Sequence, residues 1–209
     1  MAAMHDAEFL ASLPVERRLA LAYAPLRARR LWLGLFALDA RLGTTVHKAA
    51  EPMLTQIKLA WWRDELAKPQ AERRRGEPLL ALLEDWGDDA ACLGALVNGW
   101  ELVLGAGPIQ PDAALEFAGE RARACVSLAK RLGLAADDTA QAAQGWALAD
   151  IGAALAEPVD FAWRPVRLPR ELRPLQVLYG LAARNRGQGP LLSGPIAAIR
   201  AVGLGLLGI

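Results

Sequence analysis

Cysteine and histidine are scarce in this chain of 209 residues. Only Cys92, Cys125, His5 and His47 occur, and the two cysteines are widely separated. Zinc sites and disulfide frameworks need several such residues at short intervals, so we expect neither. The formal net charge is only +1, which leaves no overall field to attract nucleic acid. We therefore expect no nucleic-acid partner.

The chain also lacks long uncharged hydrophobic runs. The first thirty residues contain Asp6, Glu8 and Glu16, so we expect no secretory signal and a cytoplasmic location. Residues 191–209 are apolar, but Arg200 near their middle would cost about 2.5 to 3.5 kcal/mol in a bilayer. We predict a terminal core helix there, with peripheral contact to the inner membrane as the alternative to a purely internal role.

Helical periodicity dominates what is present. Hydrophobic residues make up 54% of the chain and charged residues 22%, as in a folded protein. Leucines at positions 31, 35, 38 and 42 predict a helix over residues 26–46, and Pro25 separates it from a shorter helix before it. No segment alternates with period two, so the sequence predicts an all-α fold in one domain, residues 1–209. Further helices are expected over residues 52–66, 79–86, 90–105, 112–132 and 137–156.

The helix from residue 52 and the polar run that follows it give two further predictions. The helix from residue 52 has two apolar faces, marked by Leu54 and Ile57 and by Leu59 and Trp62, and we expect both to be buried. Residues 69–78 are polar and contain Arg73, Arg74 and Arg75 in a row. This run favours a solvated connector over an anion site.

Charge is unevenly distributed along the chain. Residues 76–120 contain nine acids and no lysine or arginine, whereas residues 161–209 contain seven arginines and one acid. Two interpretations follow: faces that complement each other within the fold or with a partner, or a basic mouth that accepts a phosphate or an anionic lipid.

Three stretches resemble the squalene/phytoene synthase family. They are residues 19–42, residues 51–66 (EPMLTQIKLAWWRDEL) and residues 164–172 (RPVRLPREL). The resemblance implies a single-domain helical bundle of the isoprenoid synthase type. It also implies relatives that join two prenyl diphosphates head to head, with aspartates on two facing helices holding Mg²⁺ against the diphosphates. Residues four apart share one helix face, which lets two carboxylates converge on one cation.

The acids of the first family motif are missing from this chain. Aligning the motif with residues 37–48 (ALDARLGTTVHK) puts the acidic positions on Gly43, Thr44 and His47. Magnesium prefers charged oxygen ligands, so this helix should not hold it. Asp39 lies one turn earlier and is expected to be a structural carboxylate.

The second family motif is eroded. Asp160 is retained, the earlier aspartate position falls on Ala156 next to Glu157, and Pro158 argues against one regular helix carrying both acids. Asp160, Glu157 and Asp150 remain as candidate catalytic residues. The resemblance also suggests a second set, for substrate binding: Arg164, Arg167, Trp61 and Tyr23.

Three hypotheses about function remain. The first is a squalene/phytoene synthase-like protein that has lost catalysis, needs no cofactor, and binds a prenyl lipid or isoprenyl diphosphate or acts with a protein partner in an assembly pathway. The second is an active Mg²⁺-dependent prenyltransferase that condenses isoprenyl diphosphates into a squalene-like or phytoene-like product. The third is an unrelated helical protein.

Overall fold

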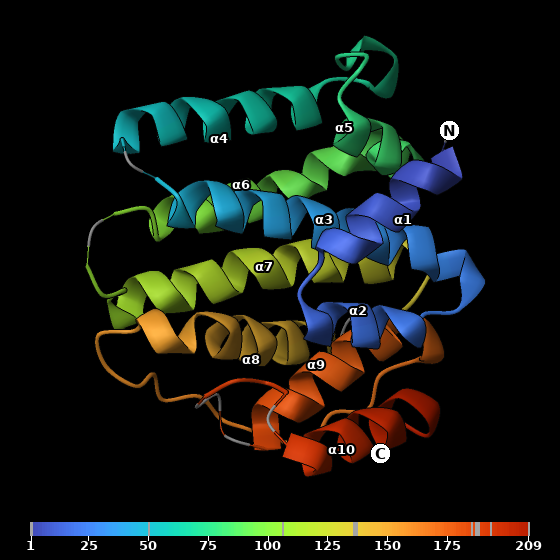
Figure 1. The fold of residues 1–209 in the computed structure, drawn as a ribbon, viewed down its shortest axis with the longest axis vertical. Helices are drawn as coiled ribbons and strands as arrows, with labels where there is room; N and C mark the ends of the chain where they lie inside the picture. The colour runs from blue at the N-terminus through green and yellow to red at the C-terminus, as the bar shows by residue number, and fades with distance from the viewer. Residues whose placement is uncertain are drawn as a thin grey trace.

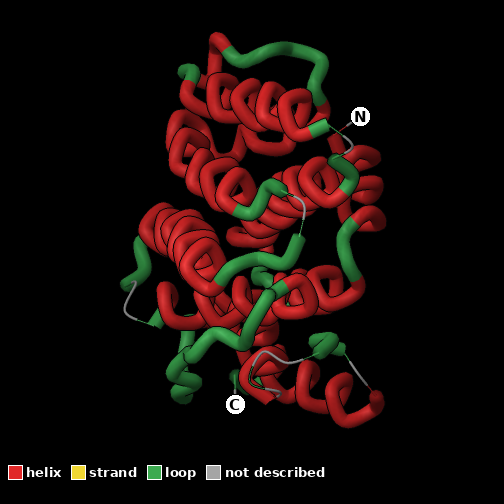
Figure 2. Tube along the Cα trace, turned by 90° about the vertical axis from the view of Figure 1, so that its left-hand side faces the viewer, coloured by secondary structure: helices red, strands yellow, loops and turns green. Residues whose placement is uncertain are grey.

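The protein is all-helical in its computed structural model, which describes residues 2–49, 51–105, 107–135, 138–184, 186, 189–192 and 194–208 (Figure 2). Among these residues the only β-type pairing is an isolated bridge between Ile109 and Leu155. The predicted all-α class is therefore confirmed. The α-helices are α1 (Ala2–Ser12), α2 (Val15–Ala22), α3 (Leu26–His47), α4 (Pro52–Ala67), α5 (Pro78–Leu82), α6 (Gly94–Leu102), α7 (Pro111–Arg131), α8 (Thr139–Ile151), α9 (Arg173–Arg184) and α10 (Gly194–Leu206).

The helices are stacked along the long axis of the molecule (Figure 1). Helix α4 lies at one end, α3 and α6 follow, α7 and α8 occupy the middle, and α9 and α10 form the other end. Helix α7 packs against α6 on one side and α8 on the other, while α2 packs against α9. The core therefore runs continuously through the stack instead of surrounding a single central helix.

Helix α3 is the most buried long element and agrees with the predicted helix over residues 26–46. Pro25 precedes its first turn, where a missing backbone N–H costs nothing. Trp32 and Phe36 are fully buried with ring centres 5.1 Å apart, and Phe36 meets Trp146 of α8 edge to face at 5.7 Å. These aromatic contacts join α3 to α8 across the core.

The prediction that both faces of the helix from residue 52 are buried is wrong. Leu59 and Trp62 are buried, but Leu54 is 51% exposed and Ile57 is 60% exposed. The reason is position: α4 is the outermost layer and packs on one side only, against α6 and the 3₁₀ segment Leu83–Leu93.

Two other expectations need correction near the middle of the chain. The predicted helices over residues 79–86 and 90–105 are instead α5, a 3₁₀ segment and α6, with a kink at Gly87, whose φ of 57° suits glycine. The helix expected over residues 137–156 ends at Ile151, followed by a 3₁₀ turn over Gly152–Ala154. Its first expected residue, Asp137, lies outside the described residues.

The C-terminal helix is only half a core helix. Ala197, Ala201 and Leu204 of α10 are buried, whereas Ile196 is 69% exposed and Ile199 is 72% exposed. The expectation of a terminal core helix is thus wrong for its outer face. In the described parts of the chain, no helix combines the length and the apolar character that crossing a bilayer requires.

Candidate functional site

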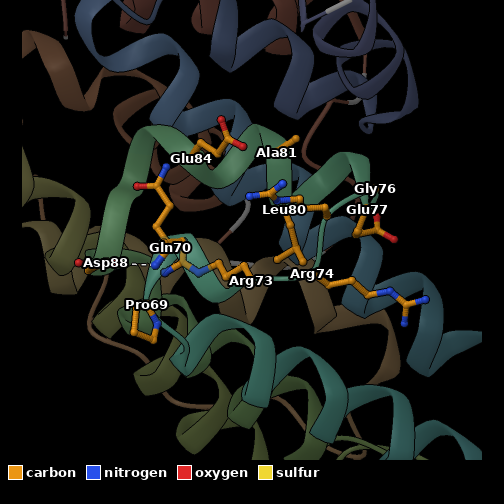
Figure 3. Close-up of a pocket in the computed structure, with 12 residues that line it drawn as sticks. Pro69, Gln70, Arg73, Arg74, Gly76, Glu77, Leu80, Ala81, Glu84 and Asp88 are labelled. Carbon is orange, nitrogen blue, oxygen red and sulfur yellow. Dashed lines mark hydrogen bonds between the residues drawn. The ribbon is translucent and has the colours of Figure 1, made fainter.

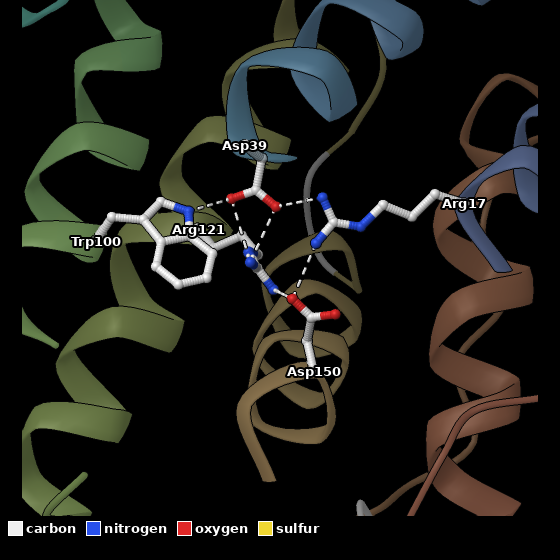
Figure 4. Close-up of polar contacts among 5 residues, drawn as sticks. All are labelled: Arg17, Asp39, Trp100, Arg121 and Asp150. Carbon is white, nitrogen blue, oxygen red and sulfur yellow. Dashed lines mark hydrogen bonds and ion pairs between the residues drawn. The ribbon is translucent and has the colours of Figure 1, made fainter. Parts of the chain in front are cut away.

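Two carboxylates and two guanidinium groups meet in the middle of the helix stack (Figure 4). Arg121 of α7 donates from Nη2 to both oxygens of Asp39 on α3, at 2.9 and 3.1 Å, and from Nη1 to Asp150 Oδ2 on α8, at 2.9 Å. Arg17 of α2 donates from Nη2 to the same Asp150 oxygen at 2.9 Å, and its Nη1 lies 2.8 Å from Asp39 Oδ2. Trp100 Nε1 also donates to Asp39 Oδ1, at 2.8 Å. We call Arg17, Asp39, Arg121 and Asp150 the central ion network.

Aromatic rings enclose the central ion network. The guanidinium carbon of Arg121 lies 4.5 Å from a ring centre of Trp146, 4.6 Å from that of Phe117 and 5.6 Å from that of Trp100. The guanidinium of Arg17 lies 5.2 Å from the Trp146 ring. A planar, weakly hydrated guanidinium stacks on such rings while donating from its edge, which an ammonium cannot do. The surroundings therefore favour arginine over lysine at both positions.

Opposite charges in the network favour the ionised forms of Asp150 and Arg17. Burial would raise the pKa of Asp150, but Arg17 and Arg121 outweigh it and lower that pKa. Burial would likewise lower the pKa of Arg17, but Asp150 and Asp39 reverse the effect and raise it. Two positive and two negative charges cancel, so the carboxylates carry no uncompensated charge that a divalent cation could neutralise.

The positions where the family motif would have acids lie beside this network. A Cβ at Gly43 would lie 2.8 Å from Cζ2 of Trp100, so no larger residue fits there unless that ring moves. Thr44 and His47 line a cavity of about 240 Å³ together with Asp39 and Asp150. Both acids are already paired with arginine. The donor set therefore does not suit Mg²⁺.

The three candidate catalytic acids are not gathered into one site. Asp150 belongs to the central ion network, whereas Glu157 and Asp160 are exposed in the segment that follows α8. Nowhere in the described parts of the chain do three or more His, Cys, Asp or Glu side chains form a group that could hold a metal ion.

Arginines gather instead around a cavity at the α9–α10 end, which we call the basic cavity. Its volume is about 570 Å³, and Arg164, Arg167, Arg186 and Arg200 line it. These side chains come from the segment after α8, the region after α9, and α10. Arginines from separate parts of the chain thus meet at one cavity.

A smaller neighbouring cavity of about 350 Å³, the apolar cavity, is lined mainly by carbon. Leu148, Leu155, Val159 and Phe161 contribute to its wall, and Glu157 borders it. It shares Trp163 and Arg186 with the basic cavity. The two cavities therefore adjoin, one polar and positively charged, the other apolar.

Two side chains of α9 and one just before α8 fix the segment that carries Arg164 and Arg167. The Tyr179 hydroxyl donates to the Arg164 carbonyl at 2.6 Å, and Gln176 accepts from the backbone N–H of Leu168 at 2.9 Å. Asp138, just before α8, accepts from Arg164 Nη1 at 3.0 Å and from the backbone N–H of Arg167 at 3.3 Å. An irregular segment held this way presents its side chains in defined positions.

A glycine on α8 makes room for Trp163, which lines both cavities. Trp163 stacks on Tyr179 with ring centres 5.7 Å apart. A Cβ at Gly145 would lie 2.6 Å from Tyr179 Cε2 and 2.9 Å from Trp163 Cζ3. The stacked pair therefore rests directly on the backbone of α8.

The four predicted substrate-binding residues fall in three places. Arg164 and Arg167 line the basic cavity together. Tyr23 is half-buried under α10, where a Cβ at Gly205 would lie 2.4 Å from its ring. Trp61 is half-buried on α4, at the opposite end of the molecule, and meets Trp62 edge to face at 4.8 Å (Figure 1).

Sequence reasoning missed Arg17 and Arg121, although a signal was present. Arg121 occupies the same helical face as Phe117 and Cys125, four residues to either side, and both are buried. A charged residue centred on an apolar stripe indicates a buried, paired charge.

No protein-family model, curated protein or solved structure matches this chain.

Proposed function

We propose that the chain is a noncatalytic helical protein of the squalene/phytoene synthase type that binds an anionic prenyl lipid at its C-terminal end. The observation that carries the proposal is the junction of the basic and apolar cavities at Trp163 and Arg186. A binding or assembly role, at the periphery of a membrane, follows from that ligand class.

The two cavities match the two halves of such a ligand. A phosphate or diphosphate head group accepts forked hydrogen bonds from guanidinium groups, and Arg164, Arg167 and Arg200 supply these on one side of Trp163. A prenyl chain needs apolar volume, and the wall of Leu148, Leu155 and Phe161 supplies it on the other side.

The outer face of α10 supports delivery of the ligand from a membrane surface. Its exposed apolar residues are Ile196, Ile199, Val202 and Leu206, spaced along one side of the helix. Arg200 of the same helix lines the basic cavity. A helix with an apolar face beside basic side chains suits the bilayer interface, where each basic residue gains about 1 kcal/mol near anionic lipids.

The central ion network favours binding over prenyl transfer. Diphosphate departs from a prenyl chain only when its developing charge is neutralised, normally by metal ions held on carboxylates. Here Asp39 and Asp150 are neutralised by Arg17 and Arg121. No carboxylate of this network remains to position a metal against a diphosphate.

Binding of farnesyl diphosphate, followed by the fluorescence of the chain's tryptophans, tests the proposal. We expect saturable binding to the native protein and at least tenfold weaker binding to the double variant R164Q/R167Q, since each lost charge-assisted hydrogen bond contributes about 1.5 to 3 kcal/mol. The matched control is R18Q, which removes an exposed arginine on α2. Farnesol, which lacks the charged head group, should bind more weakly.

Two outcomes would overturn the proposal. Equal binding of farnesyl diphosphate to the native protein and R164Q/R167Q would remove the basic cavity from the site. Release of diphosphate from farnesyl diphosphate in the presence of Mg²⁺, at a rate proportional to protein concentration, would overturn the noncatalytic assignment, and a squalene-like condensation product would establish the prenyltransferase alternative.

A further inference from the structure

The connection between α4 and α5 lines a fourth cavity, at the end of the molecule opposite α10 (Figures 1 and 3). Its volume is about 610 Å³. The run Arg73, Arg74 and Arg75 contributes to its wall, and so do Glu77, Glu84 and Asp88. The expectation that this polar run is only a solvated connector does not account for the burial of Arg73.

Arg73 is buried and incompletely paired. The residue is 7% exposed, and its Nε donates to the Lys68 carbonyl at 3.2 Å. Its Nη1 and Nη2 are buried without a hydrogen-bond partner among the residues that the structure describes. Burial lowers the pKa of Arg73, although Asp88 and Glu65 partly oppose that shift. The N–H groups of both terminal nitrogens are thus left without an acceptor among the described residues.

The acids nearest to Arg73 are engaged elsewhere. Glu65 accepts from Lys68 Nζ with one oxygen and from the backbone N–H of Arg74, at 2.8 Å, with the other. Asp88 Oδ1 accepts from the backbone N–H of Gln70 at 2.8 Å. In the central ion network, by contrast, each arginine meets two carboxylates. A buried guanidinium that lacks such partners is costly unless an anion completes it.

We propose that Arg73 binds the phosphate group of a small hydroxylated phosphomonoester in this cavity. The forked donors of a guanidinium match phosphate oxygens, and the cavity volume lies in the range of small-molecule sites. Arg74 extends away from Arg73 (Figure 3), so direct contact with the phosphate rests on Arg73. Glu77 and Glu84 on the cavity wall accept hydroxyl groups of the ligand and disfavour polyanions.

Calorimetric titration with glycerol 3-phosphate, inorganic phosphate and glycerol tests the site. We expect glycerol 3-phosphate to bind more tightly than phosphate, and glycerol to give no measurable heat. R73M should weaken glycerol 3-phosphate binding by about 10- to 100-fold, which corresponds to one charge-assisted hydrogen bond. R73K keeps the charge but loses the fork, so its affinity should fall between the two. R18M is the control for an exposed arginine.

A second measurement separates binding from folding. Without ligand, R73M should unfold at a temperature equal to or higher than that of the native protein, because it removes an unpartnered buried charge. Glycerol 3-phosphate should raise the unfolding temperature of the native protein and of R18M, and that of R73M much less. Absence of saturable binding at millimolar concentration, or equal binding to R73M, would overturn the proposal. So would Arg73-dependent binding of phosphatidic acid vesicles without binding of glycerol 3-phosphate, which would assign the site to a lipid head group.

Discussion

Replacing Arg121 by methionine tests whether the central ion network stabilises the fold as its geometry indicates. The side chain is 1% exposed, donates three hydrogen bonds to Asp39 and Asp150, and lies over three aromatic rings. Methionine fills a similar space, so little cavity energy is added. The variant leaves the buried Asp39 and the half-buried Asp150 with Arg17 alone. Removing one partner from a buried ion pair costs about 3 to 5 kcal/mol, out of about 5 to 15 kcal/mol in total.

The cost should depend on pH with a definite sign. In the native protein the lowered pKa of Asp150 contributes stability that is complete above its unfolded value of 3.8 and is lost as pH falls through the lower folded value. In R121M only Arg17 remains to oppose the burial of Asp150, so the pKa of Asp150 rises above its unfolded value. That group then destabilises the variant as pH rises. The stability difference is therefore largest at neutral pH and shrinks toward about pH 4.

Urea unfolding followed by circular dichroism at both pH values measures this difference. R18M, on the exposed side of α2, serves as the matched control and should change the free energy of unfolding by less than about 0.5 kcal/mol. A loss below about 1 kcal/mol in R121M at neutral pH, or the same loss at both pH values, would refute the reasoning, since an uncompensated buried charge must produce both effects.

Three further substitutions or modifications follow from the same region. G43D should destabilise the protein by about 1 to 3 kcal/mol in urea unfolding, because its Cβ would overlap Trp100, and it should not create Mg²⁺-dependent stabilisation; a stable, Mg²⁺-responsive variant would contradict this. W100F removes the Nε1 donor to Asp39 and should cost about 1 to 3 kcal/mol by the same measurement; an unchanged midpoint would show that Asp39 is satisfied without it. Burial raises the pKa of the Cys125 thiol to about 12. Iodoacetamide should therefore leave Cys125 unmodified in the native protein at mildly alkaline pH and alkylate it in urea, as measured by peptide mass spectrometry. Rapid alkylation of the native protein would mean that the core around α7 opens readily.

Helices with a single clear apolar stripe could be predicted from the sequence. Residues 26–46 and 112–132 were placed to within about a residue because their leucines, alanines and aromatics repeat every three to four positions. Helix α9 was not predicted, although it follows a proline-rich stretch and is buried over most of its length. Its apolar and polar residues separate onto two faces when they are placed on a helix, so a helical signal was present in the sequence.

Burial by tertiary position was the harder inference. The apolar outer residues of α4 and α10 resemble core residues in the sequence, and only the order of the helix stack shows that they end it. The candidate site likewise contains contacts that could be predicted from the sequence and contacts that could not. Arg164 and Arg167 are close in sequence, and their pairing at one cavity was predictable, whereas the meeting of Arg17 with Asp150 depends on how α2 and α8 pack. Contacts between distant segments leave no local pattern to read.

The central ion network also fixes how the helices slide against one another. It draws one side chain from each of α2, α3, α7 and α8, and both arginines bridge both acids. Moving α7 by a single turn would carry Arg121 about 5.4 Å along the helix axis. Asp39 and Asp150 would then lose their ion pairs with Arg121. Alanine-rich helix faces can pack in more than one register, but the ion pairs of the network form in only one. The buried ion pairs thus select one helix packing among several that the small side chains alone would allow with almost equal energy.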